Sequence, residues 1–141
     1  MSEEKLKPLK WKPDPSVGFT VVRRPDGGMQ IAFTDVSHTT LQHWREFALE
    51  HLLNSDRLTR NLYDLRQIDE LPEEAVQYAV EVNNDPSVRN IRMAVVATKD
   101  SVKEALRRIA ALTTSGGVEM ALFSTIEEAD AWLNRPLTLL V

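Results

Sequence analysis

The chain has 141 residues and a hydrophobic fraction of 43%, enough for one globular domain that buries roughly 70% of its unfolded surface. Its net charge of -4 argues against a nucleic-acid partner, because phosphate binding usually needs a concentrated basic surface. It contains no cysteine for disulfides or thiolate chemistry, and it lacks the roughly 20 consecutive apolar residues of an integral membrane helix.

The first 16 residues combine lysines with three prolines, Pro8, Pro13 and Pro15. Proline disfavours regular structure, so we expect residues 1–16 to form a flexible tail. A signal peptide would instead carry a continuous apolar core. Together with the lack of cysteine, this composition leads us to expect a cytoplasmic protein.

Two alternating apolar runs follow the tail, one from Val17 to Val21 and one from Met29 to Phe33. Between them, Arg24-Pro25-Asp26-Gly27-Gly28 supplies proline and glycine turn chemistry. Alternation with a period of two, interrupted by such a turn, predicts an antiparallel hairpin.

A first helix is predicted from Thr39, whose spacing to Gln42 is that of a capping box, to Asn54 or Ser55. From Arg57 to Leu133 the chain then alternates three times between a short apolar run and an amphipathic helical pattern. The runs are 61–65, 91–98 and 120–123. The helical patterns begin near Pro72, at a capping box of Ser101 with Glu104, and at one of Ser124 with Glu127.

This alternation is typical of parallel strands joined by helical crossovers. We therefore predict a single-domain α/β fold over residues 17–134, with a mixed sheet made of the N-terminal antiparallel hairpin and three further parallel strands, and about four helices. The continuous apolar run within 91–98 predicts a central strand covered on both faces. The apolar tail, residues 135–141, could cover the sheet, add an edge strand or contact a second subunit.

The order of elements resembles the SpoIIAA-like family, which is related to STAS domains and has been compared with CRAL-TRIO-type lipid-binding folds. The resemblance rests on Leu62-Tyr63-Asp64-Leu65-Arg66, on Arg92-Met93-Ala94-Val95-Val96, and on the segment from Phe123 to Leu133. It covers roughly Val17 to Leu133. Anti-sigma-factor antagonists of this type carry a phosphorylatable serine in an Asp-Ser-Ser-Gly segment. Here the matching segment, Asp69-Glu70-Leu71-Pro72, has no hydroxyl group, so a phosphorylation switch is disfavoured.

The helix after Pro72 is the most suggestive element for function. Its apolar residues spread over roughly 200 degrees of its circumference, whereas an ordinary surface helix needs a stripe of about 100 degrees. The surplus could line a ligand pocket, form a subunit interface, or simply pack against the next helix. The residues that we consider candidates for ligand binding or an interface are Leu71, Ala75, Tyr78, Val82 and Leu106.

Charge is also segregated along this part of the chain. Residues 69–85 contain six acidic and no basic residues, whereas residues 89–108 are rich in arginine and lysine. Such opposite charges could orient a partner or self-association, or form solvated local pairs. Loop residues Asp69, Glu70 and Thr98 follow the ends of strands, where open parallel sheets place ligands.

No nucleotide, hydrolase or metal-binding motif accompanies these features, so we expect no catalytic residues, no metal and no cofactor. The first hypothesis is a non-catalytic binding or regulatory domain that takes an apolar or lipid-like small molecule. The alternative is a protein-interaction or homodimerisation module without a small-molecule ligand. An enzyme that uses acidic loop residues has the least support from the sequence.

Overall fold

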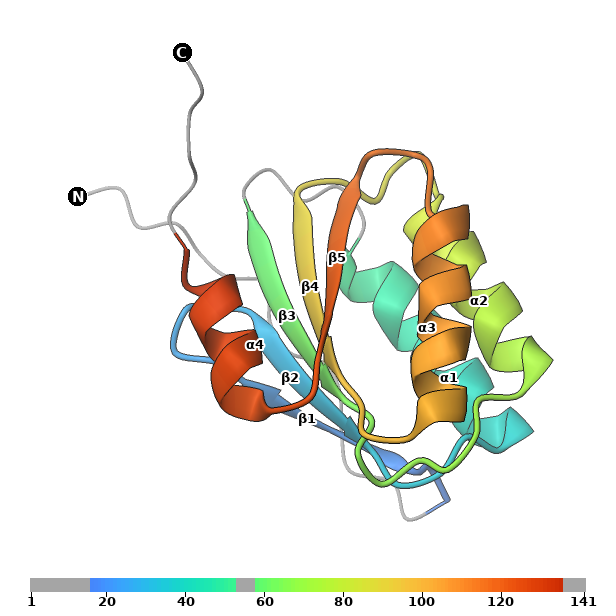
Figure 1. The fold of residues 1–141 in the computed structure, drawn as a ribbon. Helices are drawn as coiled ribbons and strands as arrows, with labels where there is room; N and C mark the ends of the chain where they lie inside the picture. The colour runs from blue at the N-terminus through green and yellow to red at the C-terminus, as the bar shows by residue number, and fades with distance from the viewer. Residues whose placement is uncertain (1–15, 53–57, 136–141) are drawn as a thin grey trace.

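The computed structural model describes residues 16–52 and 58–135. It contains one five-stranded sheet in the order β1-β2-β3-β4-β5 and four helices (Figure 1). The strands are β1 (Phe19–Arg23), β2 (Met29–Phe33), β3 (Thr59–Asp64), β4 (Ile91–Val96) and β5 (Val118–Phe123). The helices are α1 (His38–Leu52), α2 (Glu73–Asn83), α3 (Asp100–Leu112) and α4 (Ile126–Leu133). The predictions for tail residues 1–15 and 136–141 and for the end of the first helix lie outside the described residues.

The sheet has the predicted mixed topology. β1 pairs with β2 in the antiparallel sense, and β2, β3, β4 and β5 then pair in parallel. The predicted fold class is therefore confirmed. Each crossover leads to the neighbouring strand on the same side, and because such connections are nearly always right-handed, their helices lie on one face. Accordingly, α1, α2 and α3 cover one face, and the short α4 lies alone on the other (Figure 1).

Side chains fill both faces of the inner strands. All six residues of β4 are buried, and β4 lies between β3 and β5, as expected for the predicted central strand. The larger core lies between the sheet and helices α1 to α3. A smaller core lies beneath α4 and contains Leu62, Ala94, Val96, Ala129 and Leu133.

Three helix starts differ from the predicted ones. Ser37, not Thr39, caps α1, since its Oγ accepts from the Thr40 N–H at 3.2 Å. Thr125 caps α4, one residue after the predicted Ser124, by accepting from the Glu128 N–H at 3.2 Å. The predicted capping box of Ser101 does not form, because its hydroxyl donates to the Asp69 carbonyl oxygen at 2.8 Å.

Two further boundaries are corrected. Pro72 is the N-cap of α2 and not a residue of its first turn. Gly116 and Gly117 favour a helix end in the sequence, but helix α3 already ends at Leu112, before this glycine pair. Gly117 allows the backbone of Val88 to approach closely, because a Cβ added at Gly117 would lie 1.9 Å from the carbonyl oxygen of Val88.

Candidate functional site

Helix α2 lies between α1 and α3 on the helical face of the sheet. This position explains its broad apolar surface, since the helix has apolar neighbours on both flanks as well as beneath it. Val76 and Val82 are fully enclosed in the core, at 2% and 0% exposure. Tyr78 is half-buried, and the guanidinium of Arg45 lies 5.5 Å from its ring centre. The chain itself thus covers most of the surface that the sequence left unassigned.

Ion pairs along the exposed edges hold α2 to its neighbours. Glu81 accepts two hydrogen bonds from Arg45 of α1, and Glu73 accepts two from Arg108 of α3. These hydrogen bonds lower the pKa of both glutamates. The acidic and basic segments of the sequence therefore meet, at least in part, as local pairs. Exposed pairs of this kind are screened by solvent and contribute little to stability.

A cavity of about 70 Å³ lies among α1, α2, α3 and the sheet. For comparison, one water occupies roughly 30 Å³ of liquid, and an apolar cavity of roughly 150 Å³ can bind benzene. The lining is almost entirely apolar. Residues important for the argument are Trp44, Tyr63, Leu71, Ala75, Asn83 and Leu106.

The cavity brings together three of the five residues singled out from the sequence: Leu71, Ala75 and Leu106. It does not include the other two, Tyr78 and Val82, in its lining. Helical periodicity placed all five residues on apolar surfaces. It could not distinguish the part of α2 that faces the cavity from the parts that pack against α1 and α3.

Trp44 and Tyr63 form the main polar contact in the cavity wall, and sequence reasoning did not identify this pair. The Trp44 Nε1–H donates to the Tyr63 hydroxyl oxygen at 3.1 Å, and the two rings meet edge to face with centroids 6.2 Å apart. Burial raises the pKa of Tyr63 to about 12. The phenol therefore remains protonated at physiological pH. The signal for this pair was weak, because the residues belong to different elements and meet only when α1 packs on β3.

Asn83 is a third polar side chain in the lining, at the C-terminal end of α2. Its Nδ2 donates to Thr113 Oγ1 at 3.1 Å, and its backbone carbonyl oxygen accepts from Ser115 Oγ at 2.9 Å. Thr113 donates its own hydroxyl proton to the carbonyl oxygen of Ile109. This chain of contacts ties the end of α2 to the segment that follows α3.

The predicted loop residues do not form a reactive cluster. Asp69 accepts from Lys99 Nζ at 2.8 Å, which lowers the pKa of the aspartate. Glu70 and Thr98 are exposed. Within residues 16–52 and 58–135, no group of three histidine, aspartate or glutamate side chains is placed to hold a metal ion.

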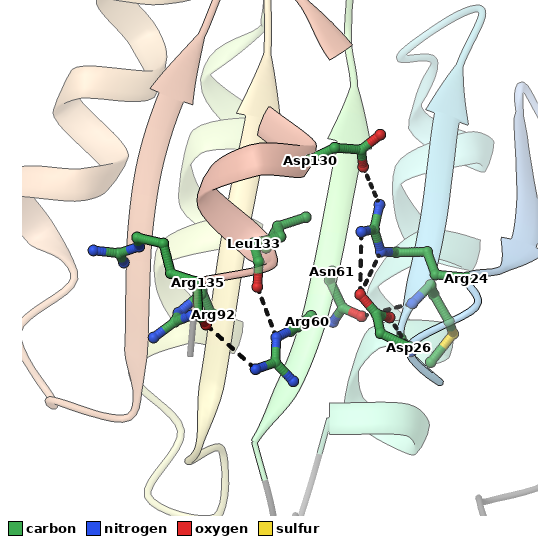
Figure 2. A network of polar contacts seen from close by, with 10 residues as sticks. Arg24, Asp26, Arg60, Asn61, Arg92, Asp130, Leu133 and Arg135 are labelled. Atoms are coloured by element: carbon green, nitrogen blue, oxygen red, sulfur yellow. Dashed lines mark hydrogen bonds and ion pairs between the residues drawn. The ribbon is translucent and has the colours of Figure 1, made fainter. Parts of the chain in front are cut away.

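Polar contacts on the opposite face serve to dock α4 (Figure 2). Arg60 and Arg92, which are paired in register on β3 and β4, donate to the carbonyl oxygens of Leu133 and Arg135 at 2.7 and 2.8 Å. Arg24 donates to Asp130 at 2.7 Å. Positive side chains are favourable at a helix C-terminus, where carbonyl groups lack helical partners.

A second pocket, a groove of about 290 Å³, adjoins this face between α4 and the β1–β2 turn. It is larger than the cavity beneath α2. However, the buried charge of Arg24 in its wall is already neutralised by Asp26 and Asp130. The groove therefore offers no buried charge in need of a partner, and we regard the more apolar cavity beneath α2 as the better candidate site.

Comparisons with known proteins identify the fold. A crystal structure of an uncharacterised protein of the DUF3478 family from Shewanella loihica PV-4, described as having a SpoIIAA-like fold, is similar to this chain with a TM-score of 0.59. The two sequences are 17% identical, and the match covers 87% of this chain and 99% of the other. No family model and no curated protein matches the sequence. The SpoIIAA-like resemblance inferred from the sequence is thus confirmed at the level of the fold.

None of the described helices is both long enough and apolar enough to span a membrane.

Proposed function

We propose that this SpoIIAA-like domain is a non-catalytic binding module that takes an apolar small molecule between α2 and the sheet. The observation that supports this proposal is the nearly apolar cavity of about 70 Å³, which has contributions from three helices and the sheet. Cavities with apolar walls and few polar groups are the usual sites of small-molecule binding.

The size of the cavity limits the ligand. At about 70 Å³, it is roughly half the volume that accommodates benzene in an apolar protein interior. A lipid-like chain would therefore require α2 to move away from the sheet. We infer that α2 is the element that moves, because exposed ion pairs join its edges to α1 and α3 and such pairs are weak.

The proposal is tested in two steps. Native mass spectrometry of purified protein, followed by solvent extraction, should detect a retained apolar compound. Xenon binding, followed by NMR, should shift the signals of Leu71, Ala75 and Leu106 in ligand-free protein. The proposal fails if no compound is retained and xenon leaves these signals unchanged.

A homodimerisation module is a second candidate, supported by the edge strand β5. Five of its six residues are only partly buried, and Leu112 at the end of α3 is 49% exposed. An unpaired strand edge is a template for pairing with another chain. We propose that two copies would associate along this edge.

Sedimentation over a range of concentrations tests this second candidate. A Leu112→Glu change should weaken the dimer, whereas Val22→Glu provides a matched control at an exposed apolar residue on the opposite edge strand, β1. A protein that is monomeric at every concentration would refute the dimer.

A further inference from the structure

The Tyr63 hydroxyl has unused hydrogen-bonding capacity within the cavity wall. Its oxygen accepts from Trp44 Nε1, and because an indole N–H can only donate, the hydroxyl proton of Tyr63 is not used in that bond. Among residues 16–52 and 58–135, the structure provides no acceptor for this proton. Tyr63 is itself 6% exposed and lines the cavity. Buried polar groups are nearly always hydrogen-bonded, so a donor of this kind calls for a partner.

The contact with Trp44 also restricts where the donor can point. The indole occupies one side of the phenolic oxygen, and the two rings are held edge to face at 73°. Tyr63 therefore carries a spare donor in a cavity wall whose other described polar side chains are Trp44 and Asn83.

We propose that the ligand of this cavity is a small neutral molecule with an apolar body and one acceptor oxygen, such as a ketone or an ether, which accepts the Tyr63 hydroxyl proton. This inference rests on the proposed function and specifies the chemistry of the molecule bound.

The lining argues against a carboxylate ligand. No lysine, arginine or histidine is among the described residues that line the cavity. A buried charge is strongly unfavourable unless it is paired and hydrogen-bonded. A single phenolic donor can satisfy a carbonyl oxygen, but it cannot neutralise an anion. A free fatty acid is therefore excluded in favour of an uncharged compound.

Acetone and isobutene provide matched probes, since they have similar shapes but acetone carries a carbonyl oxygen where isobutene carries a CH₂ group. Each is titrated into the ligand-free protein at millimolar concentrations and monitored by NMR, because molecules this small bind weakly. Tyr63→Phe should weaken acetone binding by about fivefold or more, the usual effect of losing one hydrogen bond, and should leave isobutene binding unchanged.

Tyr78→Phe is the matched control, because Tyr78 lies on α2 outside the cavity lining. It also removes one phenolic hydroxyl but leaves the Tyr63 hydroxyl in place, so the affinities for acetone and isobutene should both remain those of the wild type. The wild-type protein gives a further readout, which holds even if Tyr63→Phe does not fold. Acetone should move the Tyr63 hydroxyl proton signal downfield, and isobutene should not.

The outcomes separate this inference from the proposed function. One outcome is that both probes bind at the cavity while acetone leaves the hydroxyl signal unmoved and Tyr63→Phe weakens the binding of both probes equally. This result would refute a ligand oxygen that accepts from Tyr63, but it would leave the proposed binding of apolar molecules intact. In that case the hydroxyl proton is satisfied by water. If neither probe binds near Leu71 and Ala75, both the inference and the binding function are wrong.

Discussion

Filling the cavity from α2 should stabilise the protein and abolish binding at the same time. Ala75 is buried and faces the cavity of about 70 Å³. Core cavities destabilise proteins by about 24 cal/mol per Å³, so complete filling would contribute at most about 1.7 kcal/mol. Ala75→Leu adds three carbons, loses little helix propensity and incurs some strain. We expect a net gain of about 1 kcal/mol in the free energy of unfolding.

Urea unfolding measures this gain, and an unchanged m-value would show that unfolding exposes a similar amount of surface in the variant and in the wild type. Ala111→Leu is the matched control, because Ala111 is exposed on α3 and its substitution should change stability by no more than about 0.5 kcal/mol. Xenon and isobutene should no longer bind to Ala75→Leu. A loss of more than about 1 kcal/mol in the variant would refute the reasoning, since it would mean that the space beside Ala75 cannot accept a larger side chain.

Three further predictions concern the packing around the sheet. Between pH 10 and about 12 the free energy of unfolding should fall by about 2 kcal/mol, because Tyr63 ionises near 10.0 when unfolded but only near 12 when buried. Tyr63→Phe should remove this pH dependence in urea unfolding experiments. Arg92→Met should lower the free energy of unfolding by about 2 kcal/mol and accelerate amide hydrogen exchange in α4, because it removes the hydrogen bond to the Arg135 carbonyl oxygen. Unchanged exchange would show that Arg92 does not hold α4 in place. Gly117→Ala should destabilise the protein more than Gly116→Ala in thermal melts, since a Cβ at residue 117 would lie 1.9 Å from a carbonyl oxygen. A Cβ at residue 116 would meet no atom, so that change costs only about 1–2 kcal/mol for the positive φ. The reverse order of stability would disprove this account.

Local patterns in the sequence were sufficient to predict the fold. The alternating runs around the turn at 24–28 predict the hairpin, and the change from continuous apolar runs to helical periodicity predicts the parallel units. These signals arise from residues that are close together in the sequence, so they can be recognised without knowledge of the tertiary structure. Helix starts were less predictable, since Ser101 donates to the Asp69 carbonyl, which is 32 residues away.

The site depended on contacts that no local pattern contains. Periodicity identified the apolar surface of α2, including Leu71 and Ala75, but did not reveal that α2 would be flanked by two helices. Val82 was therefore a reasonable interface candidate until the topology enclosed it. The pairing of Trp44 with Tyr63 likewise depends on how α1 crosses β3. Such a cavity results from the geometry of several elements together and has no motif of its own.

The order of strands across the sheet, which matches their order along the chain, has a consequence for biosynthesis. Every strand that leaves the ribosome can dock beside the one made just before it, without waiting for a later segment to fill a gap. The N-terminal part of a chain is made first during translation, so the hairpin is available as a template beside which the later units of this sheet can pair. Its last unit, β5 with α4, would then be the one that closes the nascent fold.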